Sequence, residues 1–180
     1  MYLNKLEEIG EKSKDMFVLK GLIYFEKEDF EKATEYLSSA ISYGAERADV
    51  YFKRGVCFFN AKKYEEALAD FSKAIELDPT GECGSGKVAQ AYFYRARIYA
   101  YKKDIQNAIK DYTKVIQNNS ENKDALVERA KLYFESNLYD FAIRDLTEAI
   151  NSGIKDADIV LKRALSYYNL KKIHRCYKRL

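Results

Sequence analysis

Residues Tyr51 to Pro79 read YFKRGVCFFNAKKYEEALADFSKAIELDP. The apolar residues of this stretch recur at helical spacing in two runs, which are separated by the short polar segment Asn60-Ala61-Lys62-Lys63. Two helices joined by so short a connection run antiparallel. The stretch therefore predicts one antiparallel helix pair.

The same pattern recurs along the chain with a period of 34 residues. Gly21 and Gly55 begin a column of small residues that, after one longer step of 41 residues, continues at Ala96, Ala130 and Ala164. A second column of small residues holds Ala33, Ala67, Ala108, Ala142 and Cys176. Small residues are needed where two helices approach closely, and one pair cannot bury its apolar face alone. We therefore expect successive pairs to stack.

A 34-residue period with an aromatic residue, then Gly or Ala, Tyr, Ala, an aromatic, Ala and Pro resembles the tetratricopeptide repeat family. The resemblance covers Asp15 to Leu180. It implies an all-α fold, a right-handed superhelical solenoid of antiparallel helix pairs. The departures are that Ala replaces Gly in the last three copies, Leu126 and Val160 replace the leading aromatic, and only Pro79 remains at a repeat end.

With this register we expect a single domain over residues 1–180 with about ten to eleven helices. Its complete repeats are placed at about 14–47, 48–81, 89–122 and 123–156, and a partial fifth, ending in a short second helix, at 157–180. Apolar residues at 1–12 fall one period ahead of those in the first repeat, which predicts an N-terminal capping helix. The longer step places an inserted loop at about 81–87.

Three Arg–Asp combinations share a separation of 16 residues: Arg54 with Asp70, Arg95 with Asp111, and Arg129 with Asp145. One charge falls on each helix of a pair, so we expect salt bridges that tie the two helices together. We expect these bridges near the surface, where such a pair contributes roughly 0–1 kcal/mol.

The bulk composition excludes several classes of protein. The formal net charge is +3, yet five cations and no acid lie in the last ten residues, so the first 170 residues sum to −2. This balance disfavours a nucleic-acid-binding face, and the basic end is expected to be a solvated helix end. No apolar run reaches the roughly 18 residues of a membrane span. Three irregularly spaced cysteines favour a reducing compartment, the cytoplasm or the nucleus.

One segment imitates a phosphate-binding loop. Residues Gly81 to Lys87 satisfy the spacing G-x-x-x-x-G-K, but Val88 stands where a hydroxyl would hold magnesium. The preceding segment, Glu65 to Leu77, is expected to be a helix, whereas such loops follow a strand. We therefore expect no nucleotide binding here.

The sequence contains few candidate catalytic residues. The single histidine, His174, lies in the basic end, and no triad can be assembled around it. Cys57 and Cys176 fall at helix positions expected to be core, and Cys83 lies in the inserted loop. We expect a protein that is not an enzyme and needs no cofactor or metal.

The resemblance implies that a ligand lies along the concave surface formed by the first helix of each pair. The register places these partner-binding residues there: Phe52, Lys53, Val56, Phe59, Phe93, Tyr94, Arg97, Tyr101, Lys131 and Phe134. About half of the residues on this surface are expected to pack between neighbouring first helices, and the rest to form an apolar patch of the kind that marks protein-interaction sites.

The family's two-carboxylate clamp for the acidic tails of heat-shock chaperones needs Lys, Asn and Arg side chains. The matching positions hold Val18, Leu22, Lys53, Gln90 and Tyr94, or, one repeat later, Phe52, Val56, Tyr94, Asp124 and Glu128. Neither register rebuilds the clamp. We therefore expect a monomeric scaffold that binds a protein or peptide in an aromatic groove; the alternative is a targeting or regulatory arm of a larger enzyme.

Overall fold

The computed structural model describes residues 13–79, 87–118 and 122–177, with side chains as far as Lys171. The described residues form nine helices and no strand, as expected for an all-α fold. The expected capping helix at 1–12 and most of the inserted loop lie outside them. The chain forms two compact units, one up to Ile98 and one from Tyr99.

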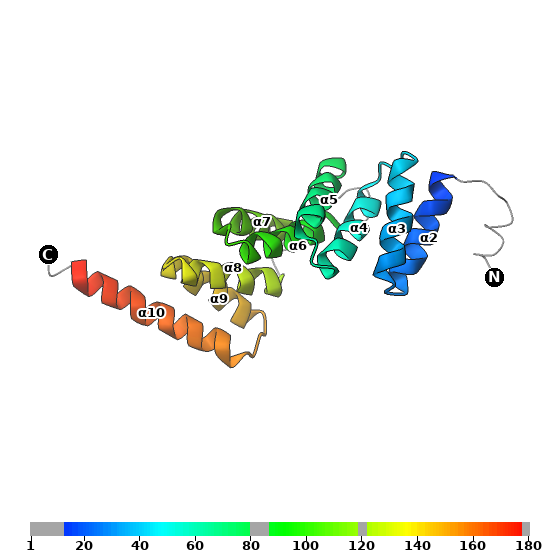
Figure 1. Ribbon diagram of the computed structural model, residues 1–180. Coiled ribbons are helices and arrows are strands. Elements are labelled where there is room, and N and C mark those ends of the chain that lie inside the picture. The colour runs from blue at the N-terminus through cyan, green and yellow to red at the C-terminus, as the bar shows by residue number, and fades with distance from the viewer. Residues whose placement is uncertain (1–12, 80–86, 119–121, 178–180) are drawn as a thin grey trace. The chain divides into compact units, whose positions relative to one another are not determined.

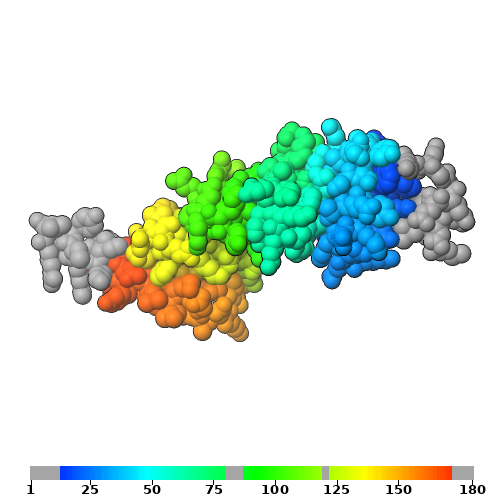
Figure 2. All heavy atoms as spheres, in the orientation of Figure 1, coloured from blue at the N-terminus to red at the C-terminus, as the bar shows by residue number. Residues whose placement is uncertain are grey.

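In each unit, helices that follow one another in sequence pack as antiparallel pairs (Figure 1). The first unit contains α2 (Lys14–Glu26), α3 (Phe30–Ser42), α4 (Ala48–Asn60), α5 (Tyr64–Leu77) and nearly all of α6 (Lys87–Tyr101). The second contains α7 (Ile105–Asn118), α8 (Lys123–Glu135), α9 (Tyr139–Asn151) and α10 (Ala157–Tyr177). Contacts join α2 to α3, α4 to α5 and α8 to α9, and α3 also meets α4. In the space-filling view α8, α9 and α10 pack closely side by side (Figure 2).

The turn inside each pair has the same conformation in all four complete copies. A non-glycine residue with φ between 59° and 63° lies two residues after the end of the first helix in each: Glu28, Lys62, Lys103 and Asn137. The next residue donates its backbone N–H to a carbonyl five residues back, for example Lys63 to Phe58 at 2.9 Å. This bond satisfies a carbonyl at the helix end, as in a Schellman motif. The spacing of these four residues, 34, 41 and 34, reproduces the sequence period.

The small residues of both columns are buried in the four complete pairs, as predicted, whereas Ala164 on α10 is exposed. Ala33, Ala67, Ala108 and Ala142 are fully buried. In the other column, a Cβ added at Gly55 would come within 2.9 Å of the Phe71 ring on α5, so even alanine at this position would require the ring to move.

Two of the three expected Arg–Asp pairs are confirmed. Arg54 donates to both Asp70 carboxylate oxygens at 2.7 and 2.8 Å, and Arg129 to both oxygens of Asp145 at 2.7 and 2.9 Å. Arg95 and its proposed partner belong to different units, so that pairing stays a prediction.

The burial of these pairs corrects the expectation that they lie near the surface. The carboxylates of Asp70 and Asp145 are 5% and 0% exposed, because each points between its two helices. Arg54 and Arg129 also donate to a hydroxyl on the preceding second helix, Ser38 at 3.2 Å and Thr113 at 2.9 Å. The charges are therefore buried and hydrogen-bonded, which makes them costly to break apart.

The fifth repeat departs from the sequence expectation. The period places a turn at Asn169 to Lys172, but α10 runs as one helix from Ala157 to Tyr177 (Figure 1). A turn there would fold back a segment with Arg179 in the column where the other pairs hold Asp, opposite Arg163. Two guanidinium groups would then face each other, and the pair would lack the ion pair that ties the other hairpins.

Candidate functional site

The first helices of the first unit gather aromatic side chains around Tyr94. The Tyr94 ring stacks on Phe71 with centroids 5.5 Å apart, and it meets Phe59 edge-on at 5.2 Å and Phe52 at 6.2 Å. Since Phe52 and Phe59 lie on α4, Phe71 on α5 and Tyr94 on α6, this ring links three helices. Four of the residues expected in the groove, counting Arg97, are thus brought together.

Burial divides this group into two sets. Phe52 and Val56 are buried and belong to the core cluster around Phe71, so they support the surface from below. Phe59 and Tyr94 are only partly buried, and so is Phe93. These three rings provide the accessible part of the aromatic group.

A cation lies over the accessible rings. Arg97 is exposed, and its guanidinium carbon lies 5.0 Å from the centroid of the Phe59 ring. This geometry allows a cation–π interaction, which holds the guanidinium at the surface with its N–H groups available to an acceptor. Arg97 and Phe59 together therefore present a charged and an apolar surface side by side.

Lys53, the other basic residue of this unit that is expected in the groove, is already paired within the chain. Lys53 Nζ donates to Glu26 Oε1 at 2.6 Å and lies 4.2 Å from the centroid of the Phe25 ring. The Lys53 side chain is 11% exposed and that of Glu26 is 71% exposed. The Lys53 ammonium lowers the pKa of Glu26 through this hydrogen bond and its charge. Sequence reasoning missed Glu26, because the acid lies 27 residues before its lysine, outside the 16-residue rule.

The remaining residues expected in the groove belong to the second unit. Tyr101 is exposed, and Phe134 meets the ring of Tyr139 edge-on at 5.7 Å. Lys131 donates to Glu128 at 2.7 Å one helical turn away. Phe134 and Lys131 thus contact residues of their own unit. That these three residues belong to one groove stays a prediction.

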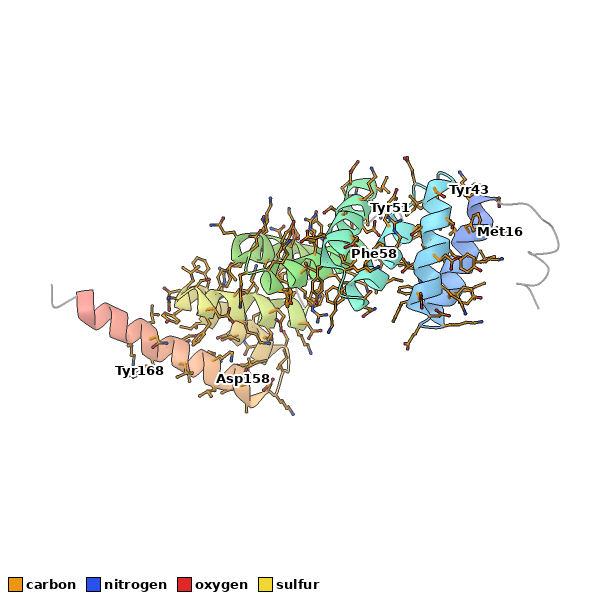
Figure 3. All side chains as sticks on the ribbon, in the orientation of Figure 1. Met16, Tyr43, Tyr51, Phe58, Asp158 and Tyr168 are labelled. Carbon is orange, nitrogen blue, oxygen red and sulfur yellow. The ribbon has the colours of Figure 1, made fainter. Side chains whose placement is uncertain are left out.

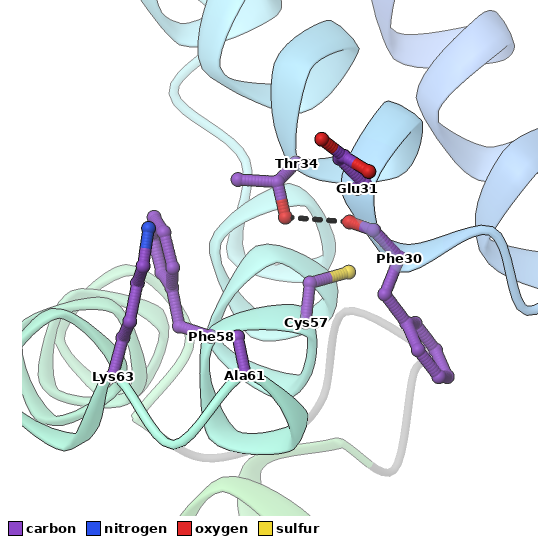
Figure 4. Close-up of a pocket in the computed structure, with 7 residues that line it drawn as sticks. All are labelled: Phe30, Glu31, Thr34, Cys57, Phe58, Ala61 and Lys63. Carbon is purple, nitrogen blue, oxygen red and sulfur yellow. Dashed lines mark hydrogen bonds between the residues drawn. The ribbon is translucent and has the colours of Figure 1, made fainter.

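A separate pocket of about 350 Å³ opens between α3 and α4. Cys57 lines it together with Thr34, whose hydroxyl donates to the Phe30 carbonyl at 2.7 Å (Figure 4). Burial raises the pKa of the Cys57 thiol to about 11. The thiol is therefore protonated at neutral pH and a weak nucleophile, in agreement with the prediction that Cys57 is a core residue.

The described residues contain no group of three or more His, Cys, Asp or Glu side chains arranged to hold a metal ion. The helix α5 leads into the glycine-rich segment, where a phosphate-binding loop would follow a strand. Among the same residues, no helix combines the length and apolar character needed to cross a bilayer.

The fold and the repeated pairs place the chain in a known class. Models of the tetratricopeptide repeat match residues 15–43, 48–80 and 89–122. The chain belongs to the tetratricopeptide repeat family, whose helix pairs form scaffolds for protein binding. No curated protein sequence matches the chain.

Several solved structures share the fold. The MamA protein has a TM-score of 0.76 at 18% identity, over 92% of this chain and 86% of its own. YrrB, described as having an unusual peptide-binding site, has a TM-score of 0.71 at 19% identity, over 89% and 84%. A tetratricopeptide repeat protein from Parabacteroides merdae ATCC 43184 has a TM-score of 0.68 at 22% identity. That match covers 93% of this chain and 62% of the other protein. These similarities concern the fold.

Proposed function

We propose that this chain holds an apolar or aromatic segment of a partner protein or peptide against the first helices of its first unit. The observation that carries the proposal is the group formed by Phe59, Tyr94 and Arg97. Two rings remain partly accessible in a well-packed setting, and an exposed guanidinium lies over one of them. Aromatic and Arg side chains supported from below are the residues that dominate binding energy at protein interfaces.

The chemistry of the surface suggests the chemistry of the ligand. An amphipathic helix or an extended segment would place apolar anchors on Phe59, Phe93 and Tyr94. An Asp or Glu near those anchors would accept hydrogen bonds from Arg97, which gives orientation and a faster encounter more than affinity. The peptide-binding site described for YrrB supports a role of this general kind.

A chaperone-tail clamp is the less favoured ligand mode. The clamp positions of the first register include Val18, which is buried, and Lys53, which already binds Glu26. A carboxylate ligand would have to displace that glutamate, and Tyr94, the last position of this register, holds a ring packed on Phe71. We therefore propose side-chain recognition through the aromatic group in place of recognition of a terminal carboxylate.

The test is a selection of displayed peptides on the full chain, followed by titration of the recovered peptide. Arg97→Ala removes an exposed side chain and should leave the melting temperature unchanged while weakening binding. Phe59→Ala should weaken binding by roughly 1–2 kcal/mol or more. Glu66→Ala, at an exposed position of the second helix α5, is the matched control and should change neither property.

Two results would contradict the proposal. One is a peptide that binds wild type, Arg97→Ala and Phe59→Ala with equal affinity, because the surface would then lie elsewhere. The other is a large loss of stability in Phe59→Ala with unchanged affinity, which would make this ring a core residue only.

A further inference from the structure

The helix α10 carries an apolar face that the described part of the chain leaves open to solvent. Val160 is 44% exposed and Tyr167 is 50% exposed, and Ala164 between them is exposed too. Successive positions 160, 164 and 167 lie on one side of a helix. The side of α10 that packs on α9 is buried at Ile159 and Ser166, and it lies roughly 100° around the helix from this face.

In the other pairs, the second helix of the pair covers the equivalent face. At the small-residue column, the space beside Gly55 is filled by Phe71 of α5. At the aromatic column, Tyr133 stacks on Phe141 of α9 with centroids 5.2 Å apart. At the charged column, Arg129 binds Asp145 of α9. One face of a first helix thus makes three kinds of contact with the second helix of the same pair, at the small-residue, aromatic and charged columns.

The residues of α10 continue these three columns. One period of 34 residues after Arg129, Ala130 and Tyr133 come Arg163, Ala164 and Tyr167. Within the described residues, Arg163 has no ion pair or hydrogen-bonded acid. The open face of α10, made of Val160, Arg163, Ala164 and Tyr167, is therefore half of a helix pair.

We propose that the open face of α10 binds an acidic amphipathic helix of a partner protein and so completes a fifth pair between two chains. The second helices of this chain show what such a helix needs. Both α5 and α9 carry Ala, then Asp three residues later followed directly by a large apolar residue, then Ala three residues after that. The partner's Asp would bind Arg163, and its large apolar residue would cover Ala164. Residues near the start of the partner helix would cover Tyr167, as Phe141 of α9 covers Tyr133.

A second copy of this chain fits the face poorly. The Asp residues in this pattern are Asp70, Asp111 and Asp145, and all three are buried in the folded chain. Two α10 helices facing each other would bring Arg163 and the basic residues that follow it together, which is repulsive. A helix supplied by another protein satisfies both the charge and the shape.

The probe is a synthetic peptide with the sequence of α9, YDFAIRDLTEAIN, stapled on its outer face so that the helix is formed before binding. Fluorescence anisotropy of the labelled peptide is measured against the full chain. We expect saturable binding with a stoichiometry of one. Tyr167→Ala and Arg163→Glu should each weaken binding roughly tenfold or more.

The adjacent tyrosine provides a matched control. Tyr168 is 65% exposed and projects from α10 into open space in Figure 3, about 100° around the helix from Tyr167. Tyr168→Ala should leave the affinity unchanged. Phe59→Ala should leave it unchanged as well, which separates this surface from the proposed peptide site of the first unit.

A charge exchange tests the ion pair itself. A peptide carrying Asp145→Lys should bind Arg163→Glu more tightly than it binds wild type. A peptide that instead replaced α9 in the fold would be insensitive to Arg163→Glu, and this result would overturn the proposal. So would the absence of binding at millimolar peptide, or self-association of the chain in sedimentation that Tyr167→Ala abolishes, since the occupant would then be a second copy.

Discussion

Separating the buried pair Arg129–Asp145 should destabilise the second unit far more than a surface ion pair would. In Arg129→Met, the Asp145 carboxylate keeps zero exposure and loses two hydrogen bonds of 2.7 and 2.9 Å. Removing one member of a buried pair costs about 3–5 kcal/mol, because it leaves an uncompensated charge. Arg144, with its Nε 3.8 Å from Asp145, can move closer, so we expect the lower end of that range.

Removing both charges should restore most of the loss. The double variant Arg129→Met with Asp145→Leu places apolar groups of similar size between α8 and α9, and such replacements are often neutral or stabilising. We therefore expect the double variant to lie within about 1 kcal/mol of wild type. The coupling energy between the two sites would then be several times that of an exposed pair.

The assay is urea unfolding followed by circular dichroism, with hydrogen exchange to assign the loss to α8 and α9. Localisation matters because repeat arrays with two compact units can unfold in more than one step. Asp158→Asn, which breaks the exposed pair with Lys162 one turn away, is the control and should change stability by less than about 0.5 kcal/mol. The reasoning fails if Arg129→Met is as mild as this control, or if the double variant is as unstable as the worse single one.

Three further outcomes are expected. Gly21→Ala should destabilise the chain in thermal melts by about 1–3 kcal/mol despite its better helix propensity, because the new Cβ would lie 2.6 Å from the Leu37 side chain; a higher melting temperature would contradict this. With the other two cysteines replaced by Ser, Cys57 should react with iodoacetamide at pH 8 at least about 100-fold more slowly than in the urea-unfolded chain, since its pKa of about 11 leaves little thiolate; equal rates would refute the burial. Burial raises the pKa of Asp70 while Arg54 opposes the rise, so Arg54→Met should raise the pKa of Asp70 further. Because protonation at lower pH removes the buried charge, the loss of stability in this variant, measured by urea unfolding, should be smaller at pH 5 than at pH 7. An equal loss at both pH values would exclude the buried charge of Asp70 as its cause.

Much of the fold follows from the sequence because the period reports a packing constraint. Gly55 and Ala130 mark the places where two helices touch, and their spacing alone locates both helices and the turn between them. The constant separation of Arg54 and Asp70 likewise reflects one geometry repeated in each pair. Most of the turn residues give no such signal: Glu28, Lys62 and Lys103 adopt a positive φ although their side chains do not favour it, and only Asn137 is of a type enriched there.

The sequence assigned the candidate residues to their helices but could not divide them into core and surface. Phe52 and Phe59 lie seven residues apart on the same side of α4, yet Phe52 is buried against Phe71 and Phe59 is partly open. The difference depends on which neighbouring helix lies above each ring, and a period shared by all repeats does not contain that information. The Lys53–Glu26 pair was missed for the same reason, since it joins two neighbouring repeats.

The departure at α10 joins the fold to the proposed interaction. In each complete pair the turn forces a non-glycine residue into the left-handed region, which costs about 1–2 kcal/mol, and the contacts of the second helix offset that cost. A turn at Lys171 would incur the same cost and return Arg179 to face Arg163, so the part of the offset that comes from the ion pair would be missing. The helix continues instead. Arg179 in place of Asp also indicates which partner helix the open face of α10 would bind, namely one that carries an acid opposite Arg163. With Arg at position 179, where the pattern needs Asp, this segment would offer Arg163 no acid, and the proposed partner helix would supply it.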